Sequence, residues 1–578
     1  MYTSADTIWV LLGAALVFFM QAGFAMVEAG FTRAKNAGNI VMKNLMDFAL
    51  GTPIFWIVGF GLMFGAGGSI FGWFDPLVQA DYAFLDLPVP LPVFLIFQTV
   101  FCATAATIVS GAMAERTKFS AYCVYSIVIS AVIYPISGHW IWGGGWLAEL
   151  GFHDFAGSTA VHMVGGVAAL VGAKILGPRI GKYDKKGRPK AILGHSLTLG
   201  ALGVFILWFC WFGFNGTSTL SATGEDTLVT MGTIFVNTNL AAAVAAVTTM
   251  CVTWIRYKKP DVSMTLNGAL AGLVAITASC DLVSPAGAAI IGIVAGAVIV
   301  FGVEFVDKVL KIDDPVGAIG VHGICGALGT LLTGVLATDG GLVYGGGFRF
   351  LGVQALGVLA VIIWVAAAMT VVFQIIKHTI GLRVSKEEEI MGLDMTEHGL
   401  ATSYADFMPM TGVAVGRARY GDGLPIPGET VPVVHKGTLP MQGNEIGATD
   451  GTGMFDGESR PRLTKLVLVF NQAKFEALKS AMNNIGVTGM TVSQVLGCGT
   501  QKGRTEYYRG VAVDMSLLPK VKVEIVVSKV PVQEVIDTAK RVLYTGHIGD
   551  GKIFVYDLQN VVKIRTGSEG YDALQDED

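Results

Sequence analysis

Two histidines stand at matching positions in two apolar segments of the chain. His162 and His322 each follow a valine, and each is followed four residues later by a glycine, so both segments read V-H-x-x-x-G. An ionisable side chain within a membrane-length apolar segment is costly and usually faces a pore or a bundle interior. Neutral imidazole donates at one nitrogen and accepts at the other, so the pair could line a narrow pore and pass a proton. A hydrogen bond between helices is the alternative, and the matched placement favours the pore.

A glycine-rich stretch near the C-terminus formally fits the phosphate-binding pattern G-x-x-x-x-G-K. It runs from Gly546 to Lys552. A P-loop needs Ser or Thr next and then a helix, whereas Ile553 follows here and a strand is predicted. We therefore expect neither an ATP-hydrolysing pump nor another enzyme. A glycine-rich turn with a lysine can still hold phosphates in another geometry.

The elements that position the histidines are predicted to be membrane-spanning helices. The chain has 578 residues, of which 15% are charged, against about 25% in a typical soluble protein. Its first two thirds contain eleven apolar stretches long enough to cross a bilayer. They lie near residues 7–31, 39–66, 92–113, 119–136, 158–177, 192–214, 229–254, 263–280, 286–305, 317–337 and 351–378.

Loop charge predicts the orientation of these spans. Lys and Arg are concentrated in the loops after spans 1, 3, 5, 7 and 9, whereas loops 68–91, 137–157, 215–228 and 281–285 contain none. Positive loops stay on the cytoplasmic side. We therefore expect a multi-pass protein of the inner (plasma) membrane, with its N-terminus outside and its C-terminal domain in the cytoplasm.

The two histidine segments lie five spans apart, which predicts an internal repeat. An odd number of spans per unit gives the two copies opposite orientations in the bilayer. An inverted-topology repeat of this kind places its substrate path near mid-membrane. The predicted fold is an α-helical membrane protein of eleven transmembrane helices with an inverted five-helix repeat, and the eleventh helix lies outside the repeat.

A soluble α+β domain is predicted beyond the spans. Strands are expected near 465–470, 490–497, 520–527 and 552–557, with helices at 473–484 and 531–544 and a short strand to about 565. The order βαββαβ is the ferredoxin-like plan. The stretch before it is rich in Gly, Pro, Thr and Asp and reads as a flexible linker. The predicted parts are a membrane domain (1–382), a cytoplasmic tail (383–405), a linker (406–461) and a regulatory domain (462–578).

Several stretches of the membrane part resemble the Amt/Mep/Rh family of ammonium transporters, the Amt branch in particular. They are residues 142–145, 154–157, 211–215, 313–315 and 320–323, with 383–385, 392–394 and 397–399 in the tail. The resemblance implies a homotrimer in a lipid bilayer. It also implies electrogenic uptake, in which ammonium is deprotonated and ammonia is conducted with transfer of the proton.

The resemblance also assigns roles to single residues. Trp142 and Ser218 would recruit ammonium, by a cation–π contact and a hydrogen bond. Asp154 would either stabilise the cation or cap a helix. Below them Phe101 and Phe214 would form an apolar gate. His162 and His322 would then be the twin histidines of the pore and its proton relay.

Stretches of the C-terminal part resemble the PII family of nitrogen-regulatory proteins. They are residues 486–492, 501–503, 505–506, 508–510, 518–522, 545–546 and 549–554. The resemblance implies adenine nucleotides bound between the subunits of a trimer, and 2-oxoglutarate bound with Mg-ATP at the base of a long T-loop. The effector-binding residues would be Gly499, Gln501, Lys520, Gly549, Asp550, Gly551, Lys552, Lys563 and Arg565. Gln501 would contact the magnesium, and Arg509 matches the T-loop arginine that enters the cytoplasmic mouth of an Amt pore.

Three positions depart from the PII pattern. Thr500 stands where the family has an arginine, and Lys563 replaces the first arginine of its R-x-R. Because lysine is not a bidentate donor, we expect a changed nucleotide affinity or preference. Val513 replaces the tyrosine that many bacterial members have uridylylated, so no uridylylation is expected there.

Together the two resemblances predict an ammonium transporter regulated in cis by a nucleotide-sensing domain. An ammonium receptor that signals through the PII-like domain, with little transport, is the alternative. No obligatory cofactor is expected, only regulatory ATP or ADP and, with them, Mg and 2-oxoglutarate. The net charge of −4 gives no indication of a nucleic-acid partner, and none is expected.

Overall fold

The computed structural model describes residues 2–400, 403, 463–471, 474–487, 489–497, 506–508, 511–513, 518–546 and 550–574. The contacts between Cα atoms divide the chain into two compact units. One comprises residues 1–408 and 506–513, and the other residues 409–505 and 514–578. The predicted linker 406–461 lies outside the described residues.

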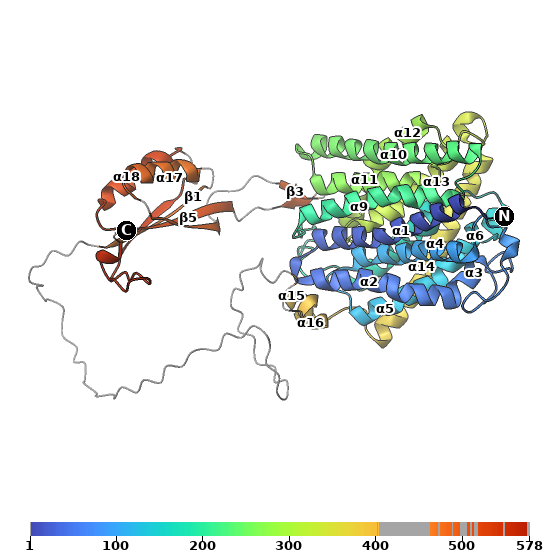
Figure 1. Ribbon diagram of the computed structural model, residues 1–578, viewed down its shortest axis with the longest axis horizontal. Helices are drawn as coiled ribbons and strands as arrows, with labels where there is room; N and C mark the ends of the chain where they lie inside the picture. Colours follow the sequence, from blue (N-terminus) through green and yellow to red (C-terminus); the bar gives the residue numbers. More distant parts are fainter. Residues whose placement is uncertain are drawn as a thin grey trace, which may run out of the picture. The chain divides into compact units, whose positions relative to one another are not determined.

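Long apolar helices packed side by side build the first unit (Figure 1). In the described part of the chain, ten helical segments are long and apolar enough to span a membrane. They contain α1 (Ser4–Phe31), α2 and α3 (Ala37–Ile54 and Phe60–Phe64), α4 (Leu91–Met113), α5 and α6 (Phe119–Val128 and Tyr134–Ile141), η5 and α8 (Ser158–Met163 and Val164–Leu176), α9 (Leu197–Gly216), α10 (Glu225–Tyr257), α12 (Pro285–Glu304), η8 and α13 (Ile319–Ile324 and Cys325–Leu336) and α14 (Arg349–Thr379). Each of the eleven predicted stretches overlaps one of these segments or the shorter helix α11 (Val262–Ile276).

Helix α11 ends before the predicted limit of its span, residue 280, because its end serves another segment. The carbonyl of Thr277 accepts the N–H of Ala156 at 3.1 Å, and the carbonyl of Ala278 accepts the N–H of Phe155 at 3.1 Å. Carbonyls used in this way cannot continue the helical ladder. The shortening therefore fixes the loop that leads into the first histidine segment.

The two histidine segments cross at small residues. A Cβ on Gly166 would lie 2.1 Å from the backbone nitrogen of Gly323, so only glycine fits there. A Cβ on Gly326 would lie 2.6 Å from the carbonyl oxygen of Ser158 and 3.2 Å from the nitrogen of Met163. In each segment the residue four after the histidine therefore meets the residue one after the other histidine. This reciprocal contact is what a twofold relation between the segments requires.

The tail after α14 folds back onto the helices of the first unit. It forms α15 (Lys386–Met391) and α16 (Leu393–His398). Asp394 accepts the backbone N–H groups of Gly38 and Asn39 at 3.1 and 2.8 Å, which caps the start of α2. The tail thus supplies a helix cap that the neighbouring sequence of α2 lacks.

The second unit contains an antiparallel sheet with helices on one face (Figure 1). The strands are β1 (Thr464–Asn471), β2 (Thr491–Gly497), β5 (Leu518–Val527) and β6 (Lys552–Asp557), and the helices are α17 (Phe475–Asn484) and α18 (Val532–Leu543). The strand order is β2-β5-β1-β6, with every neighbouring pair antiparallel, as the ferredoxin-like plan requires. Alternate residues of β1 point into the core that the two helices cover.

Two details of the C-terminal part of the chain differ from the sequence prediction. The short strand expected to about residue 565 is replaced by a turn, closed by an isolated bridge between Val562 and Glu569. The stretch expected as a long loop contains a small hairpin of β3 (Glu506–Tyr508) and β4 (Val511–Val513). Alternating side chains in so short a stretch carry little periodic signal.

Candidate functional site

One end of the helix bundle holds a cavity of about 190 Å³ that brings several predicted residues together. Its lining comprises Phe64, Phe94, Phe97, Gln98, Phe101, Trp142, Phe155, Ser218 and Leu220. The indole N–H of Trp142 donates to the carbonyl of Asp154 at 2.7 Å, which fixes the ring. The hydroxyl of Ser218 donates to the carbonyl of Phe214 at 2.8 Å, so its oxygen can still accept a bond. An aromatic ring and a hydroxyl acceptor suit a small N–H cation.

Stacked aromatic rings close the cavity on its inner side. The rings of Phe101 and Phe214 stack with centroids 4.2 Å apart and an interplanar angle of 28°. Phe101 also meets Trp142 edge-on at 6.3 Å. Both phenyl groups are buried, so an ion passing here would lose its water.

The two histidines lie next along the same row of rings. The His162 ring lies 5.3 Å from Phe214 and 5.2 Å from the His322 ring. The two Nδ1 atoms are 3.2 Å apart, a hydrogen-bond distance at which one nitrogen must carry the proton and the other accept it. Both side chains are buried. The pair can therefore hold one proton between two symmetry-related helices.

Two aspartates cap the histidine segments in the same way. Asp154 accepts the four backbone N–H groups of residues 157–160 at 2.8 to 3.0 Å. Asp314 accepts those of Gly317 and Ile319 at 2.9 and 2.8 Å. Each aspartate stands eight residues before a histidine. Asp154 is thus a helix cap, one of its two expected roles, while direct stabilisation of the cation stays a prediction.

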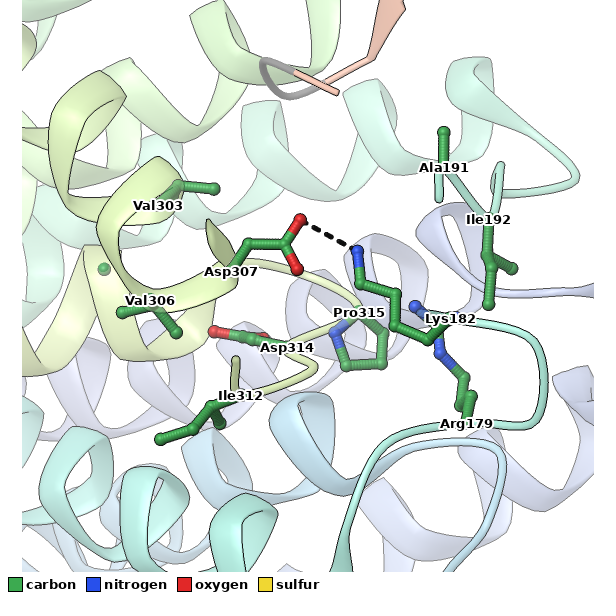
Figure 2. Close-up of a pocket in the computed structure, with 11 residues that line it drawn as sticks. Arg179, Lys182, Ala191, Ile192, Val303, Val306, Asp307, Ile312, Asp314 and Pro315 are labelled. Atoms are coloured by element: carbon green, nitrogen blue, oxygen red, sulfur yellow. Dashed lines mark hydrogen bonds and ion pairs between the residues drawn. The ribbon is translucent and has the colours of Figure 1, made fainter. Parts of the chain in front are cut away.

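A second cavity, of about 30 Å³, lies beside the cap of the second histidine segment. Figure 2 shows Lys182 and Asp307 facing each other across it, and Lys182 Nζ lies 2.9 Å from Asp307 Oδ2. Arg179, from the same loop as Lys182, binds Asp313 at 2.8 Å and Glu115 at 2.6 Å. These buried pairs tie three loops together at this end of the bundle.

The electrostatics of this loop cluster favour the ionised form of Asp313. Burial alone would raise the pKa of its carboxyl group, but Arg179 and Arg116 outweigh burial and hold that pKa well below the ordinary value. Arg116 also donates to the backbone carbonyl of Asp313 at 2.7 Å. The charges of this cluster are therefore permanent near neutral pH.

The second unit has a cavity of about 830 Å³ beside α18 and β6. Its lining includes Asp550, Gly551 and Lys552, three of the predicted effector residues, with apolar side chains and the basic residues Lys540 and Arg541. Gly551 has a φ of +118°, and a Cβ there would lie 2.3 Å from the carbonyl oxygen of Val469. A cradle that only glycine fits, next to a lysine, suits a phosphate group.

Three further predicted effector residues, all among those that the structure describes, do not line this cavity. Lys520 lies in β5 opposite Asn471, and Lys563 and Arg565 belong to the turn after β6. Gly499, Gln501, Gly549 and Arg509, with the departure Thr500, lie outside the described residues.

Comparisons with known proteins identify both parts of the chain. The Ammonium Transporter Family model matches residues 8–403. The chain belongs to the ammonium transporter family. The Nitrogen regulatory protein P-II model matches residues 463–568, so this transporter-family chain also carries a C-terminal PII domain.

The relatives and solved structures that resemble this family member match its membrane part. Ammonium transporter Amt2 of Archaeoglobus fulgidus is 49% identical over 428 residues, which cover 70% of this chain and 89% of the relative. Ammonium transporter Amt1 of Haloferax mediterranei is 41% identical, over 70% of this chain and 80% of the relative. The solved structure of a "Sensor Amt Protein" is 41% identical with a TM-score of 0.65, and the match covers 68% of this chain and 98% of that chain. The solved structure of Mep2 of Candida albicans is 30% identical with a TM-score of 0.63, and the match covers 71% of this chain and 92% of that chain.

In this ammonium transporter, the structure adds residues around the site to which the sequence alone gave no role. Trp211 stacks on His162 at 5.0 Å and donates to Thr277 at 2.9 Å, and Phe97 contacts Phe101 with ring centroids 4.7 Å apart. Trp211 precedes Phe214 by three residues, so helical spacing would have placed both rings on one face. Glu28 lines a small cavity together with His322, and its signal in the sequence was a carboxylate inside an apolar span.

Proposed function

We propose that this ammonium transporter carries net positive charge across the membrane. Ammonium is recruited at Trp142 and Ser218, loses its proton, and crosses the Phe101–Phe214 stack as ammonia. The proton follows through His162 and His322. The observation that supports this most is the 3.2 Å distance between the two buried Nδ1 atoms, directly after the aromatic stack.

A comparison of free-energy costs favours deprotonation of ammonium at the Phe101–Phe214 stack. Moving an ammonium-sized ion into a dry interior costs of order 20 kcal/mol in the idealised limit. Removing its proton at neutral pH costs about 4 to 5 kcal/mol, with an alkylammonium pKa of about 10.4 as a proxy. Neutral ammonia is therefore the cheaper species in an apolar pore, and a separate carrier is needed for the proton.

The PII domain is proposed to regulate this transport in cis. The cavity that contains Gly551 and Lys552 is the candidate nucleotide site, and Lys540 and Arg541 add positive charge for phosphates. ATP or ADP would bind there. Mg and 2-oxoglutarate would be held with Gln501 and Lys520, and effector binding would withdraw Arg509 from the pore.

The assembly is proposed to be a homotrimer. Strand β6 is an edge strand, and its Phe554 and Tyr556 side chains are 42% and 52% exposed in the single chain. An apolar edge of this kind is normally covered by another chain. With both parts in one polypeptide, matching threefold axes permit a symmetric arrangement of three pores and three PII domains.

The membrane is proposed to be the plasma membrane, with the N-terminus outside and the PII domain in the cytoplasm. Positive loops support this orientation. Tethering gives the domain an effective concentration of order mM at the pore. Control must then come from conformation or docking, because the domain cannot leave the membrane.

A receptor with little transport is the second candidate. It is favoured by the similarity to a structure named "Sensor Amt Protein", which covers 98% of that chain. The aromatic stack and histidine pair favour transport instead, since a receptor needs only the recruitment cavity. A current separates the two.

The test is a current recorded on proteoliposomes after an ammonium concentration jump, with ATP, ADP or 2-oxoglutarate present or absent. We expect a current that the effectors change in the full chain, and a loss of that response in Arg509→Ala. Ammonia flux without current would refute charge transport. Transport indifferent to every effector would refute regulation in cis.

A further inference from the structure

The first helix carries a buried carboxylate that the transport scheme leaves without a role. Glu28 stands in the last turn of α1 and is 2% exposed. Its Oε2 accepts the hydroxyl of Ser110 at 2.7 Å. A carboxylate inside a membrane span is expensive to keep and usually marks a proton or ion path.

Glu28 faces the same cavity as the second pore histidine. A cavity of about 20 Å³ is lined by both Glu28 and His322, together with Phe24. Phe24 stands one turn before Glu28 on α1, and its ring lies 5.9 Å from the His322 ring. Residues four apart lie on one face of a helix, so Glu28 continues the row of pore rings beyond His322. The cavity has room for about one water molecule.

We propose that Glu28 is the acceptor that takes the proton from His322. The N–H bond of protonated His322 breaks and an O–H bond forms on Glu28, directly or through one water. His322 returns to its neutral form. The O–H bond of Glu28 then breaks, and the proton passes to water on the side away from Trp142. The inference rests on the proton transfer of the proposed function and names the residue that completes it.

The exit beyond Glu28 leads toward the tail of the protein. Lys43 of α2 interacts electrostatically with Glu28 and stands one turn after Asn39. The Asn39 side-chain nitrogen lies 3.0 Å from Nε2 of His398 in α16. Lys43 also interacts electrostatically with Glu397 of the same helix. Polar groups thus continue from Glu28 to the end of the bundle opposite the recruitment cavity.

The test compares charge and ammonia in the same vesicles. The full chain is reconstituted in proteoliposomes, and current and internal alkalinisation are recorded after an ammonium jump. Glu28→Gln keeps the size of the side chain but cannot accept a proton. We expect its current to fall by roughly 10²-fold or more, the range of a lost acid–base group, while ammonia flux persists. Glu28→Asp should restore part of the current and shift its pH profile.

Glu304→Gln is the matched control, because Glu304 is another buried span carboxylate but pairs with Arg256 at 2.7 Å. Its current should match the wild type. A wild-type current that survives in Glu28→Gln would overturn the assignment of Glu28. A Glu28→Gln variant that loses current and ammonia flux together would also overturn it. Absence of current in the wild type would instead refute the proposed charge transport itself.

Discussion

Ionisable side chains inside this membrane unit are satisfied in two different ways. Asp154 has both oxygens bonded to backbone N–H groups, so it serves the fold of the helix that carries His162. The histidine pair and Glu28 keep few bonds and line the path. A side chain whose hydrogen-bonding capacity is fully used stabilises the fold, whereas one with unused capacity is available for proton transfer.

The buried pair of Asp313 and Arg179 is expected to be the most sensitive surface-loop contact for stability. Asp313→Ala leaves the Arg179 guanidinium buried with one carboxylate fewer. We expect a loss of about 3 to 5 kcal/mol, the usual cost of breaking a buried pair, visible as a lower Tm in detergent. Asp184→Ala is the control, because its partner Arg188 is 73% exposed and such pairs contribute about 1 kcal/mol or less.

The Asp313 carboxylate also predicts how the stability of the protein changes with pH. Because Arg179 lowers the pKa of Asp313 below the ordinary value of 3.8, its contribution is complete above that value. It is lost as the pH falls through the lower, folded-state pKa. The Tm gap between wild type and Asp313→Ala should therefore be constant between about pH 8 and pH 5. A gap that closes within that range would contradict the arrangement.

Much of the candidate site was predictable at the residue scale, and one part was not. The histidine pair follows from residue type and spacing, whereas Trp142, Ser218 and Phe101 follow from the family resemblance. The structure places those three side chains around one cavity and brings the two histidines together. The relation of Glu28 to His322 depends on how α1 rotates against the crossing segments. That rotation is decided by packing between helices, which periodicity within one helix does not specify.

At the element scale, the most important feature is the crossing of the two histidine segments, η5 with α8 and η8 with α13. The spans themselves were predictable, because bilayer thickness sets their length. The π-helical turns η5 and η8 and the early end of α11 were not predicted. The end of α11 depends on the N–H groups of Phe155 and Ala156, which bond its last carbonyls. The crossing of the segments that begin with η5 and η8 brings the two histidine side chains together.

Gly166→Ala should break this crossing. Its Cβ would lie 2.1 Å from the Gly323 nitrogen, so the helices must separate and the histidine pair with them. We expect loss of most transport activity, about 10-fold or more for a displacement near 1 Å, measured as current and flux in proteoliposomes. Gly352→Ala in α14 is the control, since no atom lies within 4 Å of the new Cβ. Wild-type current in Gly166→Ala would contradict the role of the crossing.

At the scale of the whole molecule, two families of protein are joined in one chain. The strand order of the PII domain was predictable from its βαββαβ pattern, because few topologies satisfy it. Effector binding was not, since Thr500 and Lys563 change the donors that the family pattern supplies.

A chain ending at residue 405 should separate transport from regulation. It keeps the part that covers 89% of Amt2 of Archaeoglobus fulgidus. Because this chain lacks Arg509, we expect a current close to that of the full chain with effectors bound, and no response to ATP, ADP or 2-oxoglutarate. Recordings of both chains in vesicles of one lipid composition check this. A truncated chain that still responds would show that the effector site lies in the membrane unit.

The most direct test of charge transport records current and ammonia flux together after an ammonium jump across vesicles that contain the wild-type protein. Ammonia crossing the aromatic stack while its proton follows through the histidines must carry one charge per molecule transported. We expect a transient current that scales with the ammonia flux and disappears when the protein is absent. Ammonia flux of normal size with no current would contradict the account.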